Sequence, residues 1–164
     1  MRSPAGVPLL ACLLSGPLIA QQYDLRTFSL EQGLPSASVN ALCEDLDGFL
    51  WIATDGGAAR SEGLRFDTYG QAQGLTTDEV TALHAAPDGH VWMGCRDGAI
   101  ACWLAGRFTV HPLDEAYPPT AVEAMVEDAQ GDLWAAMPGL GILQWNGTKT
   151  RLWTTTDGLP TLHV

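Results

Sequence analysis

The sequence predicts an all-β fold of four-stranded antiparallel meanders, arranged as the blades of an incomplete β-propeller. Two sequence motifs recur with a period of 41 to 42 residues, which fits a propeller blade or a helical repeat of the HEAT or armadillo kind. Turn signals about every eight to twelve residues favour strands over helices, and no stretch after residue 21 keeps apolar residues at helical spacing. The recurring positions are Gly33, Gly74 and Gly158 in a Gly-Leu motif, and Gly48, Gly89 and Gly131 followed by Trp51, Trp92 and Trp134 in the other.

The first unit shows why four strands fit one period. Residues 39–43 alternate as a half-buried strand, and the turn ending at Gly48 leads into the apolar segment 49–53. A tight turn at 54–57 precedes a short strand at 58–60, and residues 65–69 form the fourth. The corresponding segments are 80–85, 90–94, 99–104 and 107–111 in the second unit, and 121–127, 132–136, 141–145 and 148–153 in the third.

Three blades, at about 33–73, 74–115 and 116–157, are followed by the start of a further repeat at 158–164. Residues 23–30 read as an orphan fourth strand of a preceding blade, because Leu25 and Phe28 precede Gly33 with the spacing seen before Gly74. Closed propellers typically have four to eight blades. We therefore expect an N-terminal piece of a longer protein, with pooling of blades between chains as the alternative.

The N-terminus predicts export. Arg2 is followed by an apolar run at 7–19 and by a small residue, Ala20, which is the pattern of a secretory signal peptide over residues 1–20. The alternative is a lipoprotein cleavage site at Cys12, although that would leave a very short apolar segment. The run is too short to span a bilayer comfortably, so we expect a periplasmic or otherwise extracytoplasmic protein.

Composition disfavours nucleic acid as a partner. The 164 residues carry a formal net charge of -11 and only eight Lys and Arg residues, whereas binding to a phosphate backbone depends on such cations. Without the signal segment, Cys43, Cys95 and Cys102 remain. Cys95 and Cys102 flank a turn out of register, so we expect free, partly buried thiols.

No residue pattern predicts catalysis, a cofactor or a metal. The four histidines show no ligand-like spacing. The acidic segment 44–48 could suggest a calcium loop, but the acids vary between units while the glycine stays, which favours a turn with positive φ. Trp51, Trp92 and Trp134 are expected to pack one blade on the next, whereas Trp103, Trp145 and Trp153 lack equivalent positions and are candidates for surface contacts, with Trp153 also able to pack.

Residues 33–57 read Gly-Leu-Pro-Ser-x-Ser-Val-Asn-Ala-Leu-Cys-Glu-Asp-x-Asp-Gly-Phe-Leu-Trp-Ile-Ala-Thr-Asp-Gly-Gly, which resembles the two-component regulator propeller repeat. The likeness weakens in the second unit, where Arg96-Asp97-Gly98 replaces the last turn, and again in the third. It implies the periplasmic sensor region of a membrane-spanning signalling protein, often a hybrid histidine kinase, that detects a small ligand such as an oligosaccharide.

Strand direction alternates in a meander, so the turns between second and third strands share a face with the connections between blades. Loops on such a face commonly carry binding. Because a turn does not itself require their side chains, Asp55, Arg96 and Asp97 are the candidate ligand-binding residues. We expect a non-catalytic sensor with a small extracellular ligand and propeller pairing as a homodimer, attached to a membrane only through a downstream segment. The alternatives are a secreted propeller lyase or hydrolase and a soluble carbohydrate-binding module.

Overall fold

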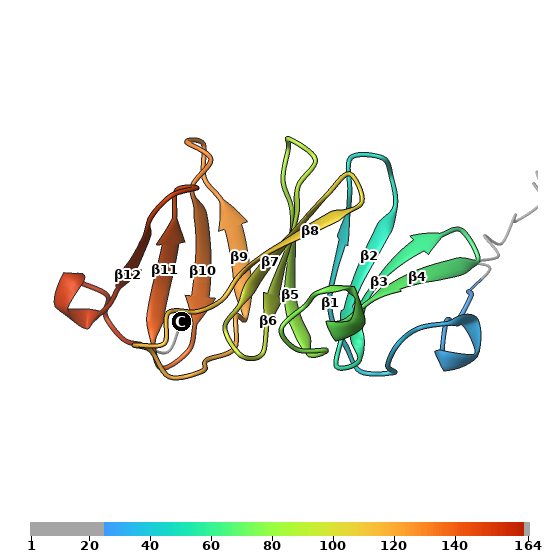
Figure 1. Ribbon diagram of the computed structural model, residues 1–164, viewed down its shortest axis with the longest axis horizontal. Helices are drawn as coiled ribbons and strands as arrows, with labels where there is room; N and C mark the ends of the chain where they lie inside the picture. Colours follow the sequence, from blue (N-terminus) through green and yellow to red (C-terminus); the bar gives the residue numbers. More distant parts are fainter. Residues whose placement is uncertain (1–24, 163–164) are drawn as a thin grey trace, which may run out of the picture.

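The computed structural model describes residues 25–162, and these form three separate four-stranded antiparallel sheets in an arc (Figure 1). Within each sheet the strands follow their order in the chain, so every sheet is a simple meander. We refer to the sheets as blades 1, 2 and 3. Blade 1 contains β1 (Val39–Glu44), β2 (Leu50–Thr54), β3 (Gly57–Glu62) and β4 (Arg65–Tyr69); blade 2 contains β5 (Val80–Ala85), β6 (Val91–Cys95), β7 (Ile100–Leu104) and β8 (Arg107–His111); blade 3 contains β9 (Ala124–Glu127), β10 (Leu133–Met137), β11 (Gly141–Trp145) and β12 (Thr150–Trp153).

The blades are arranged as in a propeller, with the first strand of each blade on the inside. β1 packs beside β5, and β5 packs beside β9, so the three first strands lie next to one another. The fourth strands β4, β8 and β12 lie at the far edge of each sheet. The all-β blade architecture predicted from the repeat period is confirmed, and the strand boundaries differ from the predicted ones by at most three residues.

The connections before blades 1 and 2 contain short 3-10 helices, η1 (Leu30–Gln32) and η2 (Gln71–Gln73), and η3 (Thr155–Asp157) follows blade 3. In each helix the amide that precedes the first turn donates to the side chain of the third helical residue, and each helix ends at a glycine of the Gly-Leu motif. Gly33, for example, has φ of 98°, a left-handed conformation that glycine adopts without strain. This explains why the motif recurs.

The predicted orphan strand at 23–30 is wrong for the residues that the structure describes. Residues 25–29 have no strand pairing, and Leu30 begins η1. A fourth strand needs a third strand to hydrogen-bond, and the described chain offers none at this edge of blade 1. Phe28 instead packs edge-on against Phe66 of β4, with ring centroids 5.4 Å apart.

Blades 1 and 2 join through a buried cluster that contains both the recurring Trp51 and Trp103 of β7. Their rings meet edge to face with centroids 5.0 Å apart, and Trp51 is fully buried. Tyr69 covers Trp51 with a stacked ring at 5.3 Å. Burying a large aromatic side chain contributes several kcal/mol, on the order of 200 Å² at about 25 cal/mol per Å².

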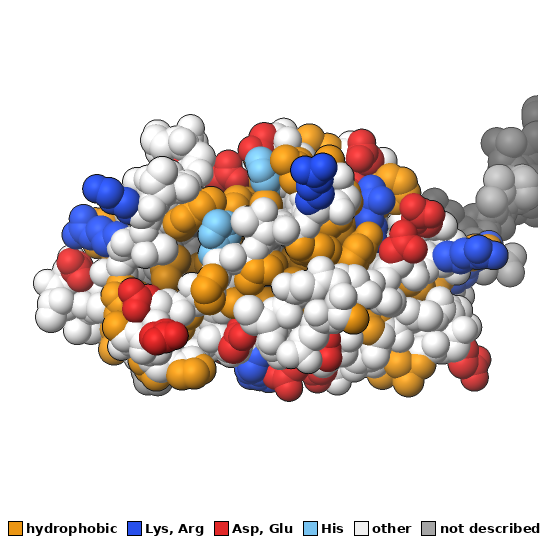
Figure 2. Space-filling view, in the orientation of Figure 1, with side chains coloured by type: hydrophobic (Ala, Val, Ile, Leu, Met, Phe, Trp, Pro, Cys, Tyr) orange, Lys and Arg blue, Asp and Glu red, His pale blue; other side chains and the backbone are white. Residues whose placement is uncertain are grey.

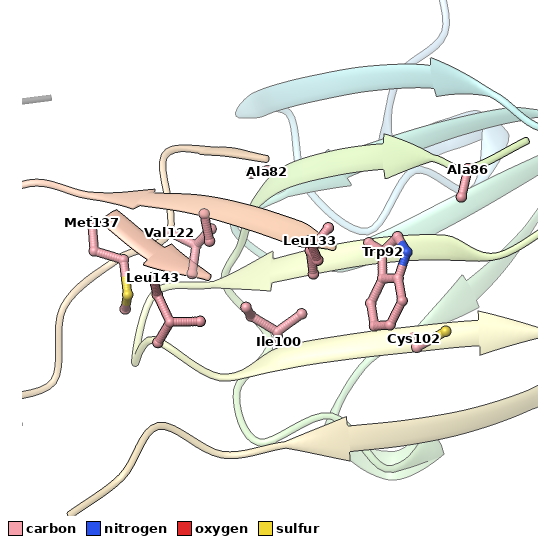
Figure 3. Close-up of a cluster of buried hydrophobic side chains, with 10 residues drawn as sticks. Ala82, Ala86, Trp92, Ile100, Cys102, Val122, Leu133, Met137 and Leu143 are labelled. Carbon is pink, nitrogen blue, oxygen red and sulfur yellow. The ribbon is translucent and has the colours of Figure 1, made fainter. Parts of the chain in front are cut away.

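Blades 2 and 3 join in the same way around Trp92, Ile100, Val122 and Leu133 (Figure 3). Trp92 meets Trp145 of β11 edge to face at 5.2 Å. Trp103 and Trp145 are in fact equivalent, because each pairs with the residue before a recurring tryptophan. The prediction that they lack equivalent positions and favour surface contacts is therefore wrong: both pack against the preceding blade.

Trp134, the third recurring tryptophan, lies on the open face of blade 3 together with Val126, Ala136 and Ile142. Trp153 packs 6.0 Å from it. Because Trp51 and Trp92 use the same position to contact a following blade, this apolar face has the composition of a blade interface.

Cys43, Cys95 and Cys102 are free thiols, with Cys95 and Cys102 buried on opposite faces of blade 2. Burial raises the pKa of Cys43 to about 11 and those of Cys95 and Cys102 to about 12. Among residues 25–162 there is no helix of the length and apolarity needed to cross a bilayer. The predicted signal peptide at 1–20, with Cys12, falls outside the described residues.

Candidate functional site

The turns between second and third strands and the connections between blades lie at one edge of the arc, the lower edge in Figure 1. Hydrogen bonds join the two kinds of loop. The Asp55 amide donates to the Ser38 carbonyl, the Arg96 amide donates to the Glu79 carbonyl, and the Gly139 amide donates to the Leu162 carbonyl. We call this edge the loop face.

Two polar pairs stand on the loop face. Asn40 donates from Nδ2 to Asp55 Oδ1 at 2.9 Å, and Arg96 donates from Nε to Glu79 Oε2 at 2.8 Å. The Arg96 and Glu79 side chains remain 61% and 44% exposed. These groups are therefore held in place by the fold and are still accessible to a solute.

The charges of the two pairs influence one another. The hydrogen bond from Asn40 and then that from Ser38 lower the pKa of Asp55, and the nearby Arg96 charge adds to this effect. The hydrogen bond to Glu79 and its charge raise the pKa of Arg96, with smaller contributions from Asp55 and from Glu123 of the connection to blade 3. The structure thus places Asp55 and Arg96 in one electrostatic group with Glu79 and Glu123.

Asn40 has a second role that the sequence analysis missed. Its Nδ2 also donates to the Val80 carbonyl of blade 2 at 2.8 Å, and Thr81, at the equivalent position of blade 2, donates from Oγ1 to the Val122 carbonyl at 2.6 Å. Each of these side chains ties its blade to the next at the first strand. The signal in the sequence is a polar residue directly after the valine that opens blades 1 and 2.

Asp97 is placed differently from the other two candidates. Its Oδ1 accepts a hydrogen bond from the Ala99 amide at 3.1 Å, which closes its own turn. Its side chain borders a groove lined by Pro112, Leu113 and Tyr117 of the connection to blade 3. Of the three predicted residues, the structure brings together Asp55 and Arg96 and places Asp97 beside this groove.

A cavity of about 390 Å³, the blade 2–3 cavity, opens between blades 2 and 3 next to this groove. Figure 2 shows hydrophobic side chains gathered along the middle of the molecule, with histidine among them. The cavity has an apolar and aromatic floor and a polar rim, and sequence analysis did not find it. Its lining comprises Trp92, Gly98, Ile100, His111, Pro112, Leu113, Asp114, Glu115, Tyr117, Leu133, Leu143, Trp145 and Thr150.

The opposite edge carries the acidic turns considered as calcium loops. Asp45 Oδ2 accepts from Trp51 Nε1 at 2.8 Å and from Arg60 Nε at 3.2 Å, and Asp128 accepts from Trp134 Nε1 at 2.7 Å. These carboxylates anchor the blade tryptophans. Within residues 25–162 there is no group of three or more His, Cys, Asp or Glu side chains placed to hold a metal ion.

Comparison with known proteins supports the repeat assignment. Residues 33–56 match the family model described as two component regulator propeller. A search of curated protein sequences found no match.

Solved structures show the same fold at low sequence identity. The extracellular domain of BT3049 from B. thetaiotaomicron, described as a hybrid two component system, superposes with a TM-score of 0.70 at 19% identity over 84% of this chain and 20% of that chain. The corresponding domain of BT4673 gives 0.69 at 16% identity over 84% and 20%. Streptogramin B lyase gives 0.63 at 18% identity over 79% and 43%.

The chain thus spans about a fifth of the length of these two extracellular domains. Its first blade carries the predicted motif, and the other two blades repeat the same strand plan. The chain is therefore a β-propeller protein with a two-component regulator propeller repeat in blade 1.

Proposed function

We propose that this chain is part of the exported, ligand-sensing propeller region of a two-component-type receptor. The observation that carries the proposal is the propeller repeat at residues 33–56 within a fold shared with extracellular domains of hybrid two-component systems. In such a protein the chain acts by recognition, and an output domain elsewhere in the receptor produces the response.

The loop face is the proposed ligand site. It presents the Asn40–Asp55 and Glu79–Arg96 pairs, which combine hydrogen-bond donors and acceptors at fixed positions. Hydroxyl groups both donate and accept hydrogen bonds, so a neutral oligosaccharide matches this arrangement. The net charge of -11 disfavours a polyanionic ligand.

Ligand binding would change how blades pack. Asp55 contacts Asn40, and Asn40 also bonds the Val80 carbonyl of the next blade. A ligand that competes for Asp55 therefore acts on a bond between blades 1 and 2. We infer that this displacement, passed to the pairing of propellers and through a membrane segment elsewhere in the receptor, is the signal.

Calorimetric titration of the full chain with neutral glucan, xylan and arabinan hexasaccharides tests the proposal. We expect at least one of them to bind, and Asp55→Asn and Arg96→Gln each to weaken binding about tenfold, in line with the loss of a charge-assisted hydrogen bond. Asp67→Asn, which neutralises an exposed carboxylate on β4, is the matched control and should bind normally. Absence of heat with every hexasaccharide contradicts the ligand class.

A secreted propeller enzyme, a lyase or a hydrolase, is the second candidate, because the chain shares its fold with streptogramin B lyase. Incubating the chain with the same hexasaccharides and analysing the products by mass spectrometry separates the two functions. The sensor proposal predicts intact hexasaccharides after prolonged incubation. Cleaved sugars that disappear in the Asp55→Asn variant would establish the enzyme instead.

A further inference from the structure

The connection between blades 2 and 3 departs from the repeat at both ends of the segment that forms the 3-10 helix elsewhere. In η2, the Gly70 amide donates to Gln73 Oε1 at 2.8 Å, and Gly74 ends the helix with φ of 112°. Position for position, Pro112 replaces Gly70 and Ala116 replaces Gly74. Proline has no amide hydrogen to donate, and alanine disfavours positive φ, so this connection cannot form the capped helix.

The same connection leaves its blade interface less filled. Between blades 1 and 2, Leu75 is 5% exposed within the interface cluster, and Tyr69 stacks on Trp51. Between blades 2 and 3, Tyr117 stands in place of Leu75, and it remains half-buried at the wall of the cavity.

His111 stands in place of Tyr69, and its ring contacts the Trp145 ring, with centroids 4.8 Å apart. The blade 2–3 cavity is thus produced by residues that break the repeat. These residues are not needed for the shared fold, which points to a function specific to this chain.

The chemistry of the lining is aromatic inside and acidic outside. Trp92 and Trp145 form part of the wall, while Asp114 and Glu115 stand exposed at the rim. The lining contains no Lys or Arg. Aromatic side chains pack favourably against an apolar or aromatic ligand body, and exposed carboxylates attract a cation. A volume of about 390 Å³ lies in the range of small-molecule sites.

We propose that the blade 2–3 cavity binds a small organic cation with an apolar body, such as an arylalkyl ammonium. The apolar body lies against Trp92, Leu133 and Trp145, and the ammonium group lies at the rim beside Asp114 and Glu115. One Asp114 oxygen already accepts from the Ala116 amide at 2.9 Å, which fixes the carboxylate in position and leaves its other oxygen for the cation. This site is separate from the loop-face site proposed for oligosaccharides.

The probe is 2-phenylethylammonium, titrated into the full chain and followed by calorimetry and tryptophan fluorescence. Two molecules of similar size serve as comparisons: neutral 2-phenylethanol and anionic 3-phenylpropanoate. We expect the ammonium to bind at least about tenfold more tightly than the alcohol, because only the cation gains the electrostatic interaction with the two rim carboxylates. The anion should bind most weakly of the three.

The location is tested with the double variant Asp114→Asn/Glu115→Gln. We expect it to bring the affinity for the ammonium down to that for the alcohol, and to leave alcohol binding unchanged. The matched control is Glu62→Gln/Asp67→Asn, which removes two exposed carboxylates from blade 1 and should bind the ammonium normally. Asp55→Asn should also bind it normally, which separates this result from the oligosaccharide proposal.

Three results would overturn the inference. The first is no detectable binding of the ammonium at millimolar concentration. The second is equal affinity for the ammonium and the alcohol, which would remove the role of charge. The third is an equal loss of affinity in the rim variant and in the blade 1 control, which would show a general effect of net charge.

Discussion

Replacing Asp45 with alanine should destabilise blade 1 severely, because this one carboxylate satisfies four donors. Oδ1 accepts from the amides of Asp47 at 3.1 Å and Phe49 at 2.9 Å, and Oδ2 accepts from Trp51 Nε1 and Arg60 Nε. Asp45 is 8% exposed and Trp51 is fully buried, so water does not easily replace the lost acceptor.

The magnitude follows from what is left unpaired. A buried donor without an acceptor costs about 1–3 kcal/mol, and breaking a buried ion pair costs about 3–5 kcal/mol. Arg60 keeps some stabilisation, because its guanidinium lies 3.7 Å from the centre of the Phe49 ring and 3.9 Å from Asp47. We therefore expect a loss of about 3–4 kcal/mol in the free energy of unfolding for Asp45→Ala.

Urea unfolding followed by tryptophan fluorescence measures this loss. At a slope of about 2 kcal/mol per M, the midpoint should fall by about 1.5–2 M. Asp47→Ala is the control in the same turn, where the side chain is 76% exposed, and it should change the stability by less than about 0.5 kcal/mol. A midpoint for Asp45→Ala equal to that of the control would refute the reasoning.

Three further predictions concern the same blades. Ala86 stands where blades 1 and 3 have Asp45 and Asp128, and the buried Nε1 of Trp92 has no hydrogen-bond partner. An aspartate there would supply the acceptor, so Ala86→Asp should raise the free energy of unfolding by about 1 kcal/mol. A lower urea midpoint in this variant would contradict the prediction. Burial alone would raise the pKa of Asp45, but hydrogen bonds from Trp51, the Phe49 amide and Arg60 outweigh it and lower the pKa. Ionised Asp45 therefore stabilises the fold above its unfolded pKa of about 3.9, and this contribution is lost as pH falls through the lower folded pKa. When pH is lowered, the free energy of unfolding should fall by more in the wild type than in Asp45→Ala. The raised thiol pKa values of Cys95 and Cys102, about 12 each, predict little alkylation of either thiol at pH 8 until urea unfolds the chain. Peptide mass spectrometry measures this labelling, and rapid alkylation of either cysteine in the folded protein would contradict the prediction.

The sequence alone was enough to predict the blades because their determinants are local and periodic. Glycine turns and the recurring tryptophan mark each meander, and strand alternation then places the turns containing Asp55 and Arg96 at one edge. That reasoning depends on strand direction alone, so it needs no knowledge of side-chain packing.

Features that depend on the packing between blades were missed. Trp103 and Trp145 lie 42 residues apart, but the β2–β3 turn is one residue shorter than the β6–β7 turn, so their counterpart in blade 1 is Ser61. Because blade 1 has no aromatic residue at that position, Trp103 and Trp145 alone do not show a recurring tryptophan in the sequence.

The blade 2–3 cavity was missed for a related reason. The cavity forms where Pro112 and Ala116 prevent the capped 3-10 helix and Tyr117 replaces the buried leucine of the other connection. Recurring motifs do not reveal positions at which the repeat is broken. The sequence signal for the cavity is the set of position-by-position differences between the connections. Spacing predicts the orphan strand, but a strand also needs a partner to hydrogen-bond, and spacing does not reveal that partner.

Successive units are equivalent blades packed side by side through their tryptophans. Nuclear Overhauser contacts between tryptophan rings test this packing most directly, in a sample where only tryptophan carries ring protons. The ring centroids of Trp51 and Trp103 lie 5.0 Å apart, and those of Trp92 and Trp145 lie 5.2 Å apart. The two members of each pair belong to adjacent blades. We predict a ring-to-ring contact for both pairs, and the absence of both from a folded sample would contradict the account.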